Sequence, residues 1–184
     1  MRPPLNKERL DEFMETLGRE FRGKYARIYF VGGASLVYEG LKEITIDIDI
    51  NLKQTPPEEQ GALVRTLREL KYKLELNIEE ASPEEFIPLP SGALDRGVYL
   101  QRIGNVEFFH FDLYSTSLSK IGRGSEKDYE DVLKLLEHAK ISWEKLEIFY
   151  DEIFPKLAEH SLKADPERFK GNFSHLKEQW NKKN

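Results

Sequence analysis

Apolar and polar positions follow two different periods along this chain. In residues 7–22 the apolar side chains recur at steps of three and four, which predicts an amphipathic helix. Residues 26–31 are a short apolar run that ends at two glycines, which is typical of a buried strand. Residues 45–52 alternate polar and apolar side chains, which predicts a strand with one buried face. The chain therefore begins as a mixture of helices and strands.

The remaining elements follow from the same patterns. Two apolar runs at residues 98–103 and 106–113 are joined by Gly104-Asn105, a dipeptide typical of hairpins. Residues 71–78 predict another strand, and residues 81–93 predict a loop because Pro, Gly and Ser are frequent there. Further helices are predicted at residues 34–40, 58–70, 116–121, 126–138, 142–159 and 166–182.

Only helical patterns follow Tyr114, so the strands are confined to the first part of the chain. This order predicts an α+β fold, with a mixed β-sheet flanked by helices in residues 1–114 and a C-terminal helical region in residues 115–184. The length of 184 residues suits one compact domain, or one domain with a helical extension.

Composition narrows the classes of function. The chain has no cysteine, which excludes disulfides, thiolate metal sites and cysteine nucleophiles. Its net charge of -5 argues against recruitment of nucleic acid by overall electrostatics. No apolar run is long enough to cross a bilayer, and the first residues lack the apolar core of a signal peptide. We therefore expect a cytoplasmic protein without a membrane partner.

The predicted strand 45–52 carries the most informative chemistry. Successive side chains on a strand point to opposite faces. The face expected to be buried holds Ile46, Ile48, Ile50 and Leu52. The opposite face holds Thr45, Asp47, Asp49 and Asn51. Two carboxylates two residues apart repel each other unless a cation neutralises them, and their hard oxygen atoms suit Mg²⁺, with Mn²⁺ as an alternative.

The glycine turn before that strand predicts a phosphate site. Gly32 and Gly33 follow the first strand, and their missing side chains let the backbone approach a ligand closely. The helix predicted from Ala34 would direct amide N–H groups at the same ligand, and Ser35 would add a hydroxyl donor. A phosphate chain held there would reach the metal on Asp47 and Asp49.

This arrangement resembles the nucleotidyltransferase (polymerase beta-like) superfamily. The superfamily signature is a strand ending in Gly-Gly or Gly-Ser, a short helix, and then a strand with Asp-x-Asp or Asp-x-Glu. Val31-Gly32-Gly33-Ala34-Ser35 and Asp47-Ile48-Asp49 match these motifs in that order. The resemblance implies a third carboxylate on a later strand, and the best match is Asp112, in the predicted strand 106–113.

A second resemblance lies after the last predicted strand. Leu118-Ser119-Lys120-Ile121 followed by Lys127-Asp128-Tyr129-Glu130-Asp131 looks like the small prokaryotic DUF6036/AbiEii-type branch, in which a Ser-Lys-Leu helix precedes a Lys-Asp-x-x-Asp helix. The glycines of Gly122-Arg123-Gly124 predict a break between the two helices. Together, the two resemblances cover roughly residues 29 to 135.

The resemblance implies a metal-dependent transfer of a nucleoside monophosphate from an NTP such as ATP to an acceptor, which could be RNA, protein or a small molecule. In that reaction Asp47, Asp49 and Asp112 bind two Mg²⁺ ions, and Asp112 also helps to deprotonate the acceptor. Gly32, Gly33 and Ser35 would bind nucleotide phosphates, together with Lys120. The AbiEii-type likeness further implies a toxin of a toxin–antitoxin pair, with an antitoxin protein as partner.

Simpler interpretations stay open for several of these residues. Asp47 and Asp49 could be the solvated face of an edge strand, and Asp112 could cap a helix beginning near Ser115. Asp128 and Asp131 could orient Lys120, or they could be surface partners of other lysines. A calcium loop is disfavoured because Leu52 occupies the position where that loop needs glycine. The alternative function is a non-catalytic module that binds a nucleotide or a protein.

Overall fold

The computed structural model describes residues 2–160 and 165–183, and its chain divides into two compact units. The sheet unit comprises Met1–Ser82 and Gly97–Phe111. The helical unit comprises Pro83–Arg96 and Asp112–Asn184. The boundary between residues 114 and 115 that the sequence suggests stays a prediction for the domain limits.

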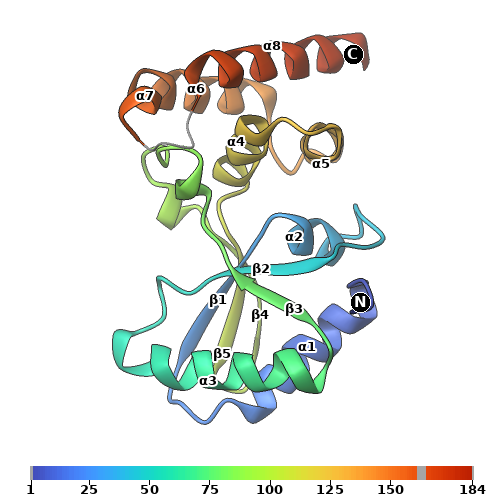
Figure 1. Cartoon of the computed structure of the whole chain (residues 1–184), viewed down its shortest axis with the longest axis vertical. Coiled ribbons are helices and arrows are strands. Elements are labelled where there is room, and N and C mark those ends of the chain that lie inside the picture. Colours follow the sequence, from blue (N-terminus) through green and yellow to red (C-terminus); the bar gives the residue numbers. More distant parts are fainter. Residues whose placement is uncertain (1, 161–164, 184) are drawn as a thin grey trace. The chain divides into compact units, whose positions relative to one another are not determined.

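The sheet unit is built on five strands in the order β3-β2-β1-β5-β4 (Figure 1). Their bounds are β1 Ala26–Val31, β2 Asp47–Asn51, β3 Asn77–Glu80, β4 Val98–Ile103 and β5 Val106–His110. Strand β1 is parallel to β5 and antiparallel to β2, while β2 is parallel to β3. Strands β4 and β5 form the expected antiparallel hairpin at Gly104-Asn105. The sheet is mixed, which confirms the predicted α+β fold.

Three helices belong to this unit: α1 Lys7–Glu20, α2 Gly33–Tyr38 and α3 Pro57–Lys73. Asn6 caps α1 by accepting a hydrogen bond from the Arg9 amide, and Pro57 opens α3 at a position that needs no N–H. Helices α1 and α3 contact each other (Figure 1). They share one core with alternate side chains of the central strands, including Ile28, Phe30, Ile48, Ile50 and Phe108.

Burial of this core is nearly complete. Phe13 and Leu17 of α1 are fully buried, as are Leu63 and Leu70 of α3. Burying an apolar side chain of this size stabilises the fold by about 1.5–3 kcal/mol. Helices α1 and α3 therefore cover one face of the sheet. The side chains on the opposite face do not belong to this core.

The alternation predicted for residues 45–52 holds for two of the three isoleucines. Ile48 and Ile50 are buried as predicted, but Ile46 is 73% exposed. The prediction for Ile46 is wrong because β2 begins only at Asp47, whereas Thr45 forms an isolated bridge with Leu5. Ile46 therefore lies before the strand, where the sheet does not position it against the core.

Several other predicted elements have different limits, and three of these differences have a clear local cause. Residues 71–73 belong to α3 rather than to a strand, because the chain turns only at Glu75, which has φ 50°. The strand predicted to end at residue 113 stops at His110. The helix predicted over residues 142–159 is interrupted after Ile153, next to Pro155, whose ring nitrogen donates no hydrogen bond.

The helical unit has α4 Leu113–Arg123 packed against α5 Glu126–Glu137, α6 Trp143–Ile153 and α8 Pro166–Lys183. Short elements complete it: η1 Pro83–Glu85, η2 Ala93–Asp95, η3 Phe154–Lys156 and α7 Leu157–His160. Gly124 ends α4 with φ 66°, which confirms the break predicted there. Within the described part of the chain, no helix is both long and apolar enough to cross a membrane.

Candidate functional site

The glycine turn lies directly against the strand that carries Asp47 and Asp49. Val31 pairs with Asp49 across the antiparallel β1–β2 ladder, and Gly32 follows at once with φ 71°. A Cβ atom on Gly32 would lie 3.1 Å from Asp49 Oδ2, and one on Gly33 would collide with the Thr45 hydroxyl. The two glycines therefore allow the turn and the start of α2 to approach β2 more closely than other residues would.

Ser35 lies in α2, but its hydroxyl already has an internal partner. The side chain is only 2% exposed, and Oγ donates a hydrogen bond of 3.1 Å to the carbonyl oxygen of Phe30. This contact fastens α2 to the end of β1. The expected contact of Ser35 with a phosphate stays a prediction, and it would require the hydroxyl to exchange its present acceptor.

Asp47 and Asp49 share one sheet face with two polar residues of β3. The parallel register places Asp47 beside Asn77 and Asp49 beside Glu79. Asn77 Nδ2 donates to Asp47 Oδ1 and lies 3.2 Å from Glu79 Oε1. Asp47 and Asp49 are both half-buried, so solvent and ligands can reach them. The face thus gathers three carboxylates and one amide on two adjacent strands.

The sequence interpretation missed Asn77 and Glu79. The signal that could have found them is the polar–apolar alternation of Asn77, Ile78 and Glu79, which matches the alternation in β2. What the pattern could not give is the β2–β3 pairing, which places Glu79 beside Asp49.

This donor set suits a hard divalent cation that a substrate helps to bind. Carboxylate oxygens are ligands that Mg²⁺ prefers, and this ion commonly binds through one or two carboxylates plus phosphate oxygens. Among residues 2–160 and 165–183, no group of three or more acidic or histidine side chains is arranged to hold a metal ion on its own. An ion bound at these residues would therefore need further ligands, such as phosphate oxygens.

Asp112 has a different environment from the one expected for a strand residue. The predicted strand position is wrong, because β5 ends at His110 and Asp112 is the N-cap of α4. Its carboxylate accepts from the Tyr114 and Ser115 amides at 3.3 and 3.2 Å and from Ser115 Oγ at 2.6 Å. Arg96 donates two more hydrogen bonds, from Nε at 3.1 Å and Nη2 at 2.8 Å.

These five hydrogen bonds occupy both oxygens of a side chain that is 1% exposed. Asp112 also belongs to the helical unit, whereas Asp47 and Asp49 belong to the sheet unit. The capping role that the sequence left open is therefore present, and the role of third metal-binding carboxylate stays a prediction.

Lys120 is part of a buried network of charges between α4 and α5. The side chain is 4% exposed, and Nζ lies 2.7 Å from Asp131 Oδ2 and 3.4 Å from Asp128 Oδ1. Arg123 Nη2 donates to Asp128 at 2.6 Å. Of the two interpretations left open for Asp128 and Asp131, these contacts support the one in which both orient Lys120. Its expected contact with a nucleotide stays a prediction.

The electrostatic balance around Asp128 favours its ionised carboxylate. Burial opposes the charge on Asp128, but the charge of Lys120, the hydrogen bond from Ser125 and the charge of Arg123 outweigh it. The pKa of Asp128 consequently lies below its ordinary value. Two cations and two anions form a group with no net charge, which suits a structural role.

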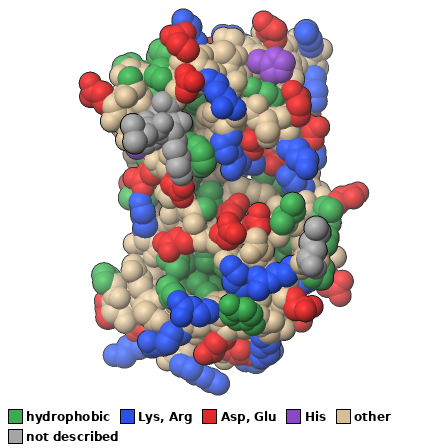
Figure 2. Space-filling model, in the orientation of Figure 1, with side chains coloured by type: hydrophobic (Ala, Val, Ile, Leu, Met, Phe, Trp, Pro, Cys, Tyr) green, Lys and Arg blue, Asp and Glu red, His purple; other side chains and the backbone are tan. Residues whose placement is uncertain are grey.

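The surface shows no concentration of one sign of charge on the face drawn in Figure 2, where Lys and Arg side chains alternate with Asp and Glu among the described residues. This distribution agrees with the net charge of -5.

Comparisons with known proteins give one match. A family model described as "Nucleotidyltransferase of unknown function (DUF6036)" matches residues 8–181, which includes both units. No curated protein and no solved structure matches the chain.

Proposed function

Because the chain belongs to the DUF6036 family of nucleotidyltransferases, we propose that it transfers a nucleoside monophosphate from an NTP, such as ATP, to an acceptor. The observation that carries this proposal is the placement of Asp47 and Asp49 against the Gly32-Gly33 turn. The turn would receive the β- and γ-phosphates through its backbone amides, since glycine carries no side chain that would cover them. The carboxylates would then face the phosphate chain from β2.

The proposed reaction is an in-line displacement. An acceptor hydroxyl oxygen attacks the α-phosphorus, the bond to the bridging oxygen of pyrophosphate breaks, and the hydroxyl proton passes to a carboxylate. Two bound Mg²⁺ ions would stabilise the attacking and leaving oxygens. Asp47 and Asp49 would hold these ions, and Asn77 would fix the orientation of Asp47 through its amide.

Two residues compete for the third carboxylate. The sequence resemblance assigns the role to Asp112, which would first have to release Arg96. Glu79 needs no such exchange, because it already lies beside Asp49 on the exposed side of β3. If Glu79 is the third carboxylate, Glu79→Gln weakens metal-dependent nucleotide binding. If Asp112 takes this role after releasing Arg96, Asp112→Asn weakens that binding instead.

Calorimetry with ATP, with and without Mg²⁺, tests the binding step. We expect tighter binding with Mg²⁺, because phosphates and carboxylates together complete its coordination. Equal affinity under the two conditions would contradict the two-metal mechanism.

The acceptor class is open among RNA, protein and small molecules, and a label-transfer experiment decides it. ATP labelled at the α-phosphate is incubated with the protein in a nucleotide-depleted lysate, and the RNA, protein and small-molecule fractions are counted. Label in one fraction identifies the acceptor. Transfer should be absent in the Asp47→Asn, Asp49→Asn double variant.

A non-catalytic nucleotide-binding module is the second candidate. It is favoured by the engagement of Asp112 in five hydrogen bonds. Mg²⁺-dependent ATP binding without label transfer or pyrophosphate release would support this candidate.

A toxin role with an antitoxin partner, which the AbiEii-type likeness implies, is also a proposal. Growth arrest on expression that depends on Asp47 and Asp49 would support it.

A further inference from the structure

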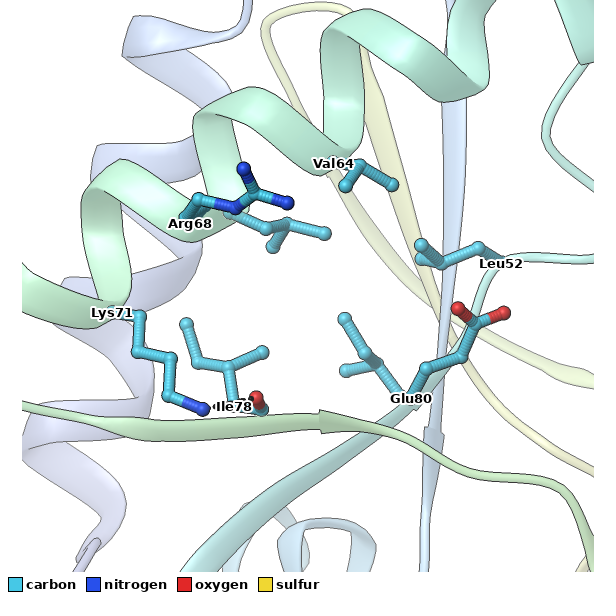
Figure 3. A pocket seen from close by; sticks show the side chains of 8 residues that line it. Leu52, Val64, Arg68, Lys71, Ile78 and Glu80 are labelled. Carbon is cyan, nitrogen blue, oxygen red and sulfur yellow. Dashed lines mark hydrogen bonds between the residues drawn. The ribbon is translucent and has the colours of Figure 1, made fainter.

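A pocket of about 190 Å³ lies on the other face of β2, beneath α3 (Figure 3). Its apolar lining comes from β2 and the residue that follows it, from β3 and from α3 of the sheet unit: Ile50, Leu52, Ile78, Val64 and Leu67. Three charged side chains complete the lining: Arg68 and Lys71 from α3, and Glu80 from β3. The pocket is therefore separate from the face that carries Asp47 and Asp49.

The pocket exists because α3 covers this part of the sheet incompletely. Val64, Arg68 and Lys71 recur at steps of four and three, so they lie on one side of the helix. Val64 is the only apolar member of that set, and it is 39% exposed. Ile50 and Ile78, which lie beneath Val64, are 2% and 9% exposed. They form an apolar floor under the charged side chains of the rim.

The rim has charges that the described residues do not pair. Within residues 2–160 and 165–183, the side chains of Arg68 and Glu80 have no hydrogen-bond or ion-pair partner. Lys71 Nζ donates to the carbonyl oxygen of Ile78 at 3.3 Å, which uses one of its three donors. Figure 3 shows the Arg68 guanidinium and the Glu80 carboxylate on opposite sides of the opening. The rim therefore has one net positive charge and a free guanidinium fork.

We propose that this pocket binds a small monocarboxylic acid that carries one ring or a branched chain. The planar guanidinium of Arg68 matches a carboxylate in geometry and charge, and the apolar floor takes the body of the molecule. An apolar cavity of about 150 Å³ is large enough for benzene, so this volume suits one ring with a short substituent. A monoanion also balances the net charge of the rim. The proposal does not depend on the proposed transferase activity.

Methyl NMR of the full chain with two matched probes tests the proposal. Phenylacetate has the ring and the carboxylate, and 2-phenylethanol is its uncharged counterpart. We expect phenylacetate to shift the methyl signals of Ile50, Ile78 and Val64 and to bind at least about tenfold more tightly than the alcohol, because a hydrogen bond to a charged group is worth about one to two factors of ten. Equal binding of both probes, shifts at other methyl groups, or no shifts would overturn the proposal. Tighter binding of phenylalanine than of phenylacetate would also overturn it, in favour of a zwitterion.

Single substitutions identify the charge that discriminates between the probes. Arg68→Met keeps the apolar stem and removes the guanidinium, so the preference for phenylacetate should disappear. Arg65→Met is the matched control, because Arg65 is also exposed on α3 but does not line the pocket. Glu80→Gln should strengthen phenylacetate binding by removing a like charge. A preference retained in Arg68→Met, or lost equally in Arg65→Met, would contradict the assignment. Arg68 and Arg65 are both exposed, so thermal melts of these two variants should show intact folding.

Discussion

Two groups of charged residues in this molecule have opposite environments. In the helical unit, buried Lys120 meets buried Asp128 and Asp131, and Arg123, whose side chain is 42% exposed, also contacts Asp128, so the charges of the network balance. In the sheet unit, Asp47 and Asp49 are half-buried and share their face with a third acid, Glu79. Buried charges need partners to be tolerated, whereas an acidic face in contact with solvent can be kept for a cation.

The comparison separates residues that the fold needs from residues that a ligand would need. It predicts that neutralising the network destabilises the protein, while neutralising the pair on β2 does not. Four substitution experiments compare buried charged residues of the helical unit with the pair on β2.

The largest effect is expected for Lys120→Met. Removing one partner of a buried ion pair leaves the other charge uncompensated, which costs about 3–5 kcal/mol. Chemical unfolding measures the change. The matched control is Lys127→Met, because Lys127 is exposed at the start of α5 and its loss should change stability by less than about 0.5 kcal/mol. Similar small changes for both variants would remove the structural role assigned to the network.

A smaller loss is expected for Asp112→Asn. Asn still caps α4, since it is as good an N-cap as Asp. The substitution removes the negative charge that Arg96 contacts, so a buried charged hydrogen bond is weakened and the cost should be about 1–3 kcal/mol. If unfolding is unchanged, the Arg96 contact contributes nothing to the fold, and Asp112 becomes a stronger candidate for metal binding.

The pH dependence of stability gives a third test. The pKa of Asp128 is lower in the folded protein than its ordinary value, which is about 3.9 in an unfolded chain. Its contribution is therefore fully present above about pH 4 and is lost as pH falls through the folded pKa. Denaturant melts between pH 7 and pH 2.5 should show a shallower acid decline for Asp128→Asn than for wild type. Glu130→Gln, exposed on the same helix, is the control and should keep the wild-type slope.

Much of the fold follows from sequence patterns that depend on local geometry. The limits of β1, the hairpin between β4 and β5 and the break at Gly124 are all as predicted, because glycine turns and short apolar runs act through neighbouring residues. The buried alternation of Ile48 and Ile50 is as predicted for the same reason. Ile46 differs because a strand's first residue depends on its pairing partner.

The candidate site could be predicted only in part. Asp47, Asp49 and the glycine turn are close in sequence, and the β1–β2 ladder brings them together as expected. Glu79 joins them through a pairing between strands 30 residues apart, which no local pattern specifies. The Arg96–Asp112 pair similarly joins an irregular segment to a helix start. Such contacts arise from tertiary packing, so sequence periodicity does not reveal them.

The smallest effect on stability is expected at the pair on β2, and it tests the central claim most directly. The measurement is Mg²⁺-dependent ATP binding by the Asp47→Asn, Asp49→Asn double variant, with a thermal melt of the metal-free protein. Asn keeps the shape of each side chain and removes the repulsion between charges, so the melting temperature should stay equal or rise. Binding that depends on Mg²⁺ should be abolished. A large drop in melting temperature, or ATP binding that still depends on Mg²⁺ as in wild type, would contradict the assignment of Asp47 and Asp49 to the ligand.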